Sequence, residues 1–323
     1  MILVTGATGF LGSELVKQIT DQGFPVRAIK RQSSQIPPLL QDLPLVEWAN
    51  ADILDYFALE QAFESVTHVY HCAALLSFAR EDKKKMLKIN REGTHHIVNL
   101  CQQNNITKLV HVSSVAALGE ARNGLAVTEK NPWEFNGSQS GYSISKYESE
   151  MEVWRAIAEG LNAVIVNPSI IIGKNTGKKG SGQIFATSKK GIKFYTSGSN
   201  GFIDVEDVAK AMIMLMQSNI TAEGFLLNAE NRDLKDILTQ ALKAFNYSAP
   251  SIEAKPWMME LGWRSAALLS LLNGKKYGLT KDTARSAFER ISYSNEKFHQ
   301  YFPDFAYKPI NTSIKAICDA LNT

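Results

Sequence analysis

Cysteine is scarce in this sequence: Cys72, Cys101 and Cys318 form no closely spaced pair. This spacing excludes a disulfide-rich scaffold and a zinc motif built on cysteine, and an odd, low count favours a reducing compartment. The apolar runs "AMIMLM" and "AALLSLL" are much shorter than the ~20 residues of a membrane span. The opening "MILVTGATGF" has neither a charged leader nor a small-residue cleavage site. We therefore expect a cytoplasmic protein without a metal site or a membrane partner.

Strong charge of either sign is also missing, since the formal net charge is +3. A balance so close to neutrality gives no reason to expect nucleic acid or another polyanion as a partner. Hydrophobic residues make up 45% of the chain and charged residues 21%, which is ordinary for a globular protein. The length of 323 residues allows one large domain or two modest ones.

Short apolar runs alternate with amphipathic segments in the first half of the chain, which predicts βαβ units and a parallel sheet. The expected strands are 2–6, 24–30, 45–52, 68–74, 108–114 and 162–169. The expected helices are 11–22, 55–64, 82–104 and 141–160. The fold class is therefore α/β, with a doubly wound parallel sheet of Rossmann type over 1–169.

The alternation stops after Ser169, where "IIIGKNTGKKGSGQ" is rich in glycine and lysine and predicts a loop. A helix over 205–217 and a strand "GFLLNA" follow, then several helices. We expect 170–323 to form a smaller, mainly helical substrate-binding region, with 203–230 returning to the first domain. "PWMMELGWRSAALLSLLNG" (256–274) could form a lid or a partner surface, but an ordinary packed helix is the favoured interpretation.

Three glycines, Gly6, Gly9 and Gly12, lie between the first strand and the first helix in "VTGATGFLG". Glycine permits a tight turn and lets backbone N–H groups approach a phosphate. A strand before it and a helix after it are the context of a dinucleotide-binding turn. Thr8, Phe10 and Leu11 belong to the same expected cofactor contact.

The end of the second strand carries Lys30 and Arg31, where NAD-binding folds usually place an acidic residue for the ribose 2′-OH. Two cations suit a 2′-phosphate, so NADP(H) is favoured and NAD(H) is the alternative. The plainer interpretation is that both cations are simply solvated. Asp52 and Ile53 follow the third strand and are candidates for adenine contact, whereas Asp55 is expected to cap the next helix.

A tyrosine with a lysine four places later occurs three times, as Tyr142–Lys146, Tyr277–Lys281 and Tyr293–Lys297. On a helix this spacing places both side chains on one face, where an ammonium can act on a phenol. The spacing alone does not choose among the three pairs.

The order of several motifs decides the question. The chain resembles the extended short-chain dehydrogenase/reductase family in "TGATGFLG", "HCAA" (71–74), "INREGT" (89–94), "HVSSVAALG" (111–119), "YSISK", "NPSIIIG" (167–173) and "GFIDVEDVAKAM" (201–212). The resemblance runs from residue 1 to about residue 215 and is loose beyond it. It selects Tyr142–Lys146, and the other two pairs are then chance spacings.

The resemblance implies a role for each catalytic candidate. Tyr142 would exchange a proton with the substrate oxygen, and Lys146 would bind the nicotinamide ribose and lower the pKa of Tyr142 toward neutrality. Ser114 would hydrogen-bond the same oxygen, with Ser113 as its rival, and Asn90 would hold a water in a proton relay. Further cofactor contacts are implied for Cys72, Ala73, Ala74, Pro168 and Ser169.

The resemblance is closest to reductases related to dihydroflavonol reductase and the 3β-hydroxysteroid dehydrogenases. Val115 and Ala116 stand where dehydratases carry an acidic pair, and Asn167 stands where many sugar enzymes place Arg. We expect an NADP(H)-linked oxidoreductase that interconverts a carbonyl and an alcohol on a small, largely apolar molecule. A nucleotide-sugar epimerase or dehydratase and a non-catalytic NADP sensor are the alternatives.

The apolar side chains expected around the substrate are less certain, because several of them could be core residues instead. They are Leu75, Leu76, Phe78, Val115, Ala117, Ile170, Phe185 and Phe202. A homodimer formed through the helices 82–104 and 141–160 is a further expectation from the resemblance.

Overall fold

The nearly continuous apolar runs of the first half form a parallel sheet, as predicted. The computed structural model describes residues 1–77, 80–121, 124–137, 139–177, 180–273 and 279–322. Its main sheet has seven strands in the order β10-β6-β5-β4-β1-β2-β3. They are β1 (Ile2–Thr5), β2 (Val26–Lys30), β3 (Val46–Asn50), β4 (His68–His71), β5 (Lys108–Val112), β6 (Ala163–Pro168) and β10 (Glu223–Leu227). Every adjacent pair in it is parallel.

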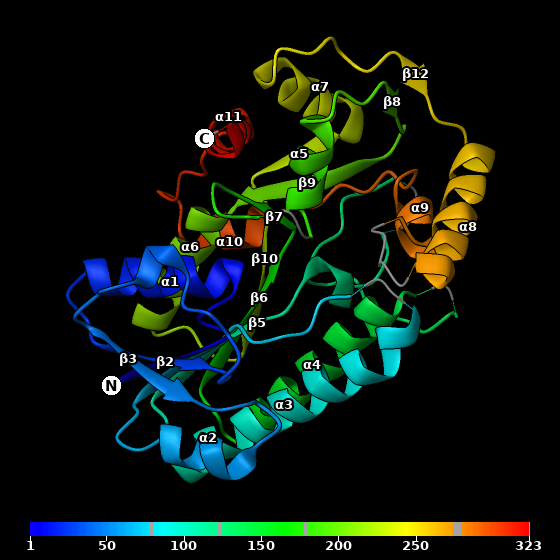
Figure 1. Cartoon of the computed structure of the whole chain (residues 1–323). Helices are drawn as coiled ribbons and strands as arrows, with labels where there is room; N and C mark the ends of the chain where they lie inside the picture. Colours follow the sequence, from blue (N-terminus) through cyan, green and yellow to red (C-terminus); the bar gives the residue numbers. More distant parts are fainter. Residues whose placement is uncertain (78–79, 122–123, 138, 178–179, 274–278, 323) are drawn as a thin grey trace.

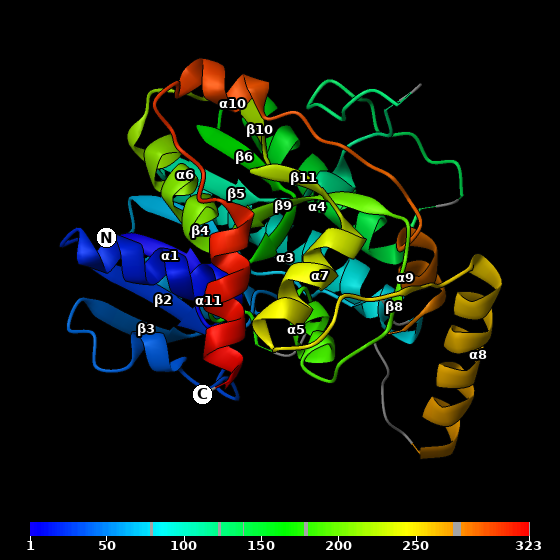
Figure 2. The ribbon, with the colours of Figure 1, turned by 90° about the horizontal axis from the view of Figure 1, so that it is seen from above.

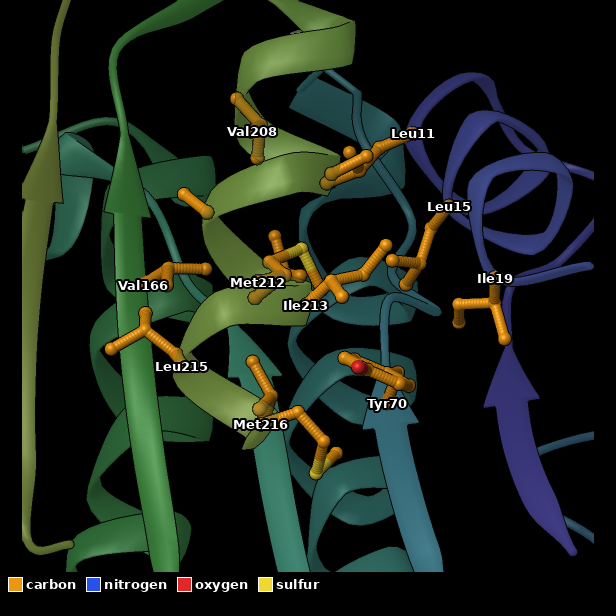
Figure 3. Packing of buried hydrophobic residues seen from close by; sticks show 14 of the residues in the cluster. Leu11, Leu15, Ile19, Tyr70, Val166, Val208, Met212, Ile213, Leu215 and Met216 are labelled. Carbon is orange, nitrogen blue, oxygen red and sulfur yellow. The ribbon is translucent and has the colours of Figure 1, made fainter. Parts of the chain in front are cut away.

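Helices cover both faces of this sheet (Figure 1), so the central strands are buried on both sides. The helices of this part are α1 (Phe10–Asp21), α2 (Tyr56–Ala62), α3 (Lys83–Gln103), α4 (Gly141–Ala158) and α6 (Val205–Gln217), with 3₁₀ turns η1 (Pro38–Leu40), η2 (Arg80–Asp82) and η3 (Val115–Ala117). Helices α1 and α6 share one hydrophobic cluster with the sheet, while α3 and α4 pack in a second cluster. Figure 3 shows side chains of α6, Met212 among them, between Val166 of β6 and Leu11 of α1.

The second part of the chain contains more strands than expected. Its elements are β7 (Ile170–Ile172), α5 (Gly182–Ser188), β8 (Phe194–Tyr195), β9 (Ser199–Asp204), β11 (Glu230–Asp233), α7 (Leu234–Ala244), β12 (Ile252–Glu253), α8 (Pro256–Asn273), α9 (Lys281–Ser286), α10 (Glu296–Tyr301) and α11 (Ile310–Asn322). The loop expected from Ile170 onward is wrong at its start, because β7 pairs with β9 in a small second sheet. Three consecutive β-branched residues favour that pairing over a loop.

Two elements from beyond residue 200 lie against the first half. Strand β10 pairs with β6 at the edge of the main sheet, and α6 packs beside α1. Both elements lie within 203–230, and the division into two domains, with the return of this segment and the boundary at Ser169, stays a prediction.

Helix α8 differs from the ordinary packed helix that was favoured. It stands at the side of the molecule, away from the main sheet (Figure 2), and several large apolar side chains are open to solvent. The exposed fractions are 64% for Trp257, 57% for Leu261 and 76% for Leu272. Nothing in the described part of the chain has both the length and the apolar character of a membrane-spanning helix.

Lys108 links the C-terminal end of α6 to the sheet through hydrogen bonds. It begins β5 and is only 3% exposed, and its Nζ donates to the carbonyl oxygens of Leu215 and Ser218, each at 2.7 Å. Ser218 is the C-cap of α6, and its N–H and hydroxyl also donate to Leu215 O, at 3.3 Å and 2.8 Å. The ammonium adds a charged donor at this helix end. Burial lowers the pKa of Lys108, but the two acceptors and the end of the helix dipole favour its charged form.

We predict that Lys108→Met lowers the free energy of unfolding by about 1–3 kcal/mol, because the carbonyls of Leu215 and Ser218 each lose a charged hydrogen-bond donor. Urea denaturation measures the change. The control is Lys88→Met on α3, where Lys88 is largely exposed, and it should stay within about 0.5 kcal/mol of the wild type. Equal stability of the two variants would show that the ammonium does not hold the end of α6.

Candidate active site

The glycine turn is built into the point where the order of the sheet reverses. Gly6 has φ +66°, in the left-handed region, and a Cβ added to it would lie 2.7 Å from the backbone nitrogen of Ala73. A Cβ on Gly12 would lie 2.2 Å from the carbonyl oxygen of Gly6. The turn therefore packs backbone against backbone, between the carboxyl ends of the adjacent strands β1 and β4. Ligands of open α/β sheets bind at this kind of switch point.

The start of α1 offers unsatisfied donors to an anion. Gly9 occupies the N-cap position and supplies no side-chain hydrogen bond, and the first turn contains no acidic residue. The backbone nitrogen of Gly9 donates to Gly6 O at 2.9 Å, which holds the turn closed. A close-packed turn of this shape, followed by free helix N–H groups, fits the pyrophosphate of a dinucleotide.

The other residues expected at the cofactor lie along the same edge of the sheet. Lys30 ends β2 and is half-buried, and Arg31 follows it at the surface. Asp52 is exposed and accepts from the backbone nitrogen of Leu54 at 3.0 Å. Ile53 is buried against Gly93 of α3, so the protein itself takes up most of its surface. Asp55 caps α2 through the nitrogen of Ala58, as expected.

Two further segments expected at the cofactor, 72–74 and 168–169, make hydrogen bonds within the protein. Ala73 donates its N–H to Thr5 Oγ1 at 3.2 Å, and Ala74, next along, is exposed. Burial raises the pKa of the neighbouring Cys72 thiol to about 12, so it is protonated at neutral pH. Pro168 ends β6, and the N–H of Ser169 donates to Leu227 O at 2.9 Å.

The structure brings three of the catalytic candidates together. Ser140 caps α4 by accepting from Ser143 N, so Tyr142 lies in the first turn and Lys146 one turn later. Ser114 follows β5, and a side-chain hydrogen bond joins it to Tyr142. Ser114 Oγ also accepts from Ala116 N at 3.2 Å, which caps η3. A hydroxyl and a phenol thus share one place at the carboxyl edge of the sheet.

The pKa of Tyr142 is shifted upward in the protein alone, whereas a downward shift was expected with the cofactor bound. Burial raises it, and the hydrogen bond from Ser114 only partly lowers it. Lys146 directs its Nζ to the carbonyl oxygen of Val112 at 2.9 Å. In the protein alone, desolvation of the phenolate is therefore the larger effect. The lowering was expected from Lys146 together with the positive nicotinamide ring of the oxidised cofactor, and it stays a prediction. Burial in turn lowers the pKa of Lys146 to about 8.

Asn90 holds two segments together from α3. Its side-chain amide accepts from Leu75 N at 2.7 Å and donates to Leu75 O and to Ser145 Oγ, both at 3.0 Å. These bonds fix the loop after β4 against α4, one residue before Lys146. The geometry shows Asn90 placing the walls of the site, and its part in a proton relay stays a prediction.

The rival serine and the rival Tyr–Lys pair have other partners. Ser113 Oγ donates to a carboxylate oxygen of Glu150 at 2.5 Å, which favours Ser114 as the serine beside the phenol. Tyr293 is buried in a small hydrophobic cluster, and Lys297 Nζ donates to Glu223 at 2.6 Å. Tyr277 lies outside the described residues.

Two of the substrate candidates are core residues. Phe185 and Phe202 have no exposed surface, because α5, α7, β9 and α11 close around them in one hydrophobic cluster. Ala117 is also buried. Leu75, Val115 and Ile170 are half-buried and Leu76 is exposed, so they stay candidates, and Phe78 lies outside the described residues. Alternation along a strand cannot separate a pocket wall from a core, since both are apolar.

Sequence reasoning missed a buried polar layer beneath the site. His71 Nδ1 lies 2.7 Å from Thr5 Oγ1, and its Nε2 lies 3.0 Å from Thr94 Oγ1. The ring of His111 stands beside that of His71, at 5.2 Å between centroids. Burial, with Lys146 nearby, lowers the pKa of His71 to about 3 and that of His111 well below its usual value, so both rings are neutral. The sequence feature that could have indicated this layer is a histidine in each of two neighbouring strands, His71 in β4 and His111 in β5.

Residues 2–226 match the model of the NAD dependent epimerase/dehydratase family. This chain belongs to that family. It is 30% identical over 301 residues to a putative dihydroflavonol 4-reductase of Synechocystis sp., covering 91% of this chain and 87% of the relative. It is 28% identical over 262 residues to sterol demethylase protein B of Methylococcus capsulatus, covering 80% and 78%.

Solved structures agree with the fold. The crystal structure of gox2253 superposes with a TM-score of 0.85 at 25% identity, covering 100% of this chain and 98% of that one. The UDP-glucose 4-epimerase of Thermus thermophilus, solved with NAD, has a TM-score of 0.77 at 20% identity, covering 99% and 98%. These likenesses agree with the Rossmann-type α/β fold of this chain.

We predict that Gly12→Ala abolishes dinucleotide binding and lowers the thermal midpoint, because the new methyl group would meet the Gly6 carbonyl. Calorimetric titration with NADPH and a thermal melt measure both effects. Gly224→Ala in β10 is the control, since a Cβ there meets ordinary contacts of 3.6 Å and beyond. Undiminished binding by the Gly12 variant would place the dinucleotide away from this turn.

Proposed function

We propose that this family member is an NADP(H)-linked oxidoreductase that interconverts a carbonyl and an alcohol on a small, largely apolar substrate. The observation that carries the proposal is the hydrogen bond between Tyr142 and Ser114. It joins a proton donor and a second hydroxyl at the end of β5, on the edge of the sheet that also holds the glycine turn. The similarity to a putative dihydroflavonol 4-reductase supports the same class of reaction.

The hydroxyl groups of Tyr142 and Ser114 have different roles toward the substrate oxygen. A bound nicotinamide cofactor supplies or accepts the hydride. Tyr142 gives its phenolic proton to the carbonyl oxygen, and Ser114 donates a hydrogen bond that stabilises the developing charge. Because burial raises the pKa of Tyr142, the phenol is protonated at neutral pH, which suits proton donation in the reducing direction.

Lys146 is the cation of the site. Its ammonium donates one hydrogen bond to the carbonyl of Val112. An ammonium has three N–H groups, so the other two can bind a ribose or a water. With a pKa of about 8, it is mostly charged at neutral pH and loses that charge in mildly alkaline solution. Carbonyl reduction should therefore weaken on the alkaline side.

The choice of cofactor rests on the charges at the end of β2. Lys30 ends β2, and Arg31 follows it. In NAD-binding folds, the residue at this strand end usually contacts the ribose 2′ group of a dinucleotide that is bound at the glycine turn. Two cations favour a 2′-phosphate, which an acidic residue at that place would repel. We therefore propose NADP(H), with NAD(H) as the weaker ligand.

The proton-transfer prediction is tested by Tyr142→Phe, which removes only the phenolic oxygen. We expect kcat/KM for NADPH-dependent reduction, measured on a panel of apolar aldehydes and ketones, to fall about 10²- to 10⁴-fold. NADPH binding should change by less than about threefold, because Lys146 and the glycine turn are untouched. Tyr293→Phe makes the same change in the other described Tyr–Lys pair and should leave turnover intact. Full activity of the Tyr142 variant would reject the mechanism.

The cofactor prediction is tested with the double variant Lys30→Ser/Arg31→Asp. The wild type should bind NADPH at least about tenfold more tightly than NADH, and the variant should lose or reverse that ratio. Titration calorimetry with both dinucleotides measures it, and Lys17→Ser on α1 is the control for general loss of positive charge. A wild type that prefers NADH would contradict the proposal.

A further inference from the structure

A buried carboxylate lies directly beneath the catalytic candidates. Glu150 is on α4, one turn after Lys146 and two turns after Tyr142, and is only 6% exposed. One of its oxygens accepts from Ser113 Oγ at 2.5 Å and from Asn167 Nδ2 at 2.8 Å. The other accepts from the indole nitrogen of Trp154 at 3.1 Å. Three donors, from the residue after β5, from β6 and from α4, thus satisfy a group that is costly to bury without partners.

These contacts hold three successive residues where β5 ends. The carbonyl of Val112 accepts from Lys146 Nζ at 2.9 Å, and the hydroxyl of Ser113 is bound by Glu150. The carbonyl of Ser114 accepts from Asn167 Nδ2 at 3.1 Å, and the same amide nitrogen is bound to Glu150. The β5–β6 ladder reaches Ser113, whose N–H donates to Val166 O at 2.8 Å, and it no longer fixes Ser114. The carbonyl of Ser114 is held by the N–H of Ala117 at 2.9 Å and by the Asn167 amide, which is anchored on Glu150.

The same carboxylate acts on the charge of the site. Burial disfavours the ammonium form of Lys146, whereas a thiolate at Cys72 or the carboxylate of Glu150 would favour it. The thiol of Cys72 and the rings of His71 and His111 are neutral at neutral pH, because burial moves each pKa away from the charged form. Burial likewise keeps the phenol of Tyr142 protonated. Among these facing groups, Glu150 is the carboxylate, and it lies one turn from Lys146 on α4.

We propose that Glu150 is a positioning residue of the active site: its carboxylate fixes the Ser114 segment through Ser113 and Asn167 and lies one helical turn from Lys146. The inference rests on the proposed function, since it assigns the means by which the Ser114 hydroxyl is aimed at the substrate oxygen. It extends that function to a residue that contacts neither substrate nor cofactor. An uncharged residue of similar volume would fill the space but would supply neither the acceptors nor the charge.

The test is Glu150→Gln, which keeps the volume of the side chain and removes its charge. One amide oxygen cannot replace a carboxylate for three donors, so the Ser114 segment loses a partner. We expect kcat per folded molecule to fall about 10- to 100-fold, the size of effect that a small misplacement produces, with NADPH affinity changed by less than about threefold. Without the anion, the alkaline limb of the pH–kcat profile should move about one unit toward lower pH.

A second measurement does not depend on turnover. The ¹³Cε signal of Lys146, assigned by its loss in Lys146→Met, is titrated by NMR in the wild type and in Glu150→Gln. The titration midpoint should move to lower pH in the variant. A wild type without carbonyl reduction would reject the proposed function, and this titration would still decide whether Glu150 holds the charge of Lys146.

Controls separate positioning from stability. Glu148→Gln, two residues earlier on α4, should change neither kcat nor the Lys146 midpoint. If Glu150→Gln does not fold, Ser113→Ala removes one donor and should lower kcat several-fold at unchanged NADPH affinity. The proposal is overturned if Glu150→Gln only lowers stability, with kcat per folded molecule and the Lys146 midpoint unchanged. It is equally overturned if Ser113→Ala, used in its place, has wild-type kcat.

Discussion

The parallel pairing of β1 with β4 is the constraint on which the rest of the site depends. It places the turn after Thr5 against the backbone of Cys72 and Ala73, at the point where the order of the sheet reverses. Only a residue without a side chain fits there, because a Cβ on Gly6 would meet backbone atoms. Since all seven strands run the same way, everything that follows a strand gathers at that one edge, including Ser114 beyond β5.

Burial sets the chemistry of this edge. The protein interior disfavours charge, so the phenol, the thiol and both imidazoles are held neutral. Lys146 and Glu150 are the charged exceptions on α4, and each is held by hydrogen bonds to the end of β5 or to its neighbours. The site is therefore a buried polar layer whose phenol and ammonium are placed by one helix and one strand end.

The element pattern and the family could be predicted because they depend on local features. Apolar runs and helical periods placed every strand of the main sheet within a few residues, and the ordered motifs identified the family. The misses have a different origin. Ile170–Ile172 form a strand through pairing with β9, Phe185 and Phe202 are closed in a core, and α8 exposes its apolar residues. For the strand and the two phenylalanines, the residues that pack against them include ones far away in the sequence. For α8, exposure depends on how distant parts of the chain are arranged around it.

By itself, the sequence determined the α/β fold, the glycine turn and the order of the motifs that single out Tyr142, since backbone geometry and residue spacing are local properties. Tertiary structure decided which serine faces the phenol, because Glu150 takes the hydroxyl of Ser113 and leaves Ser114 beside Tyr142. It also decided the direction of the Tyr142 pKa, because that depends on how much water the surrounding elements exclude. Burial is a property of the whole fold, and spacing along the chain does not contain it.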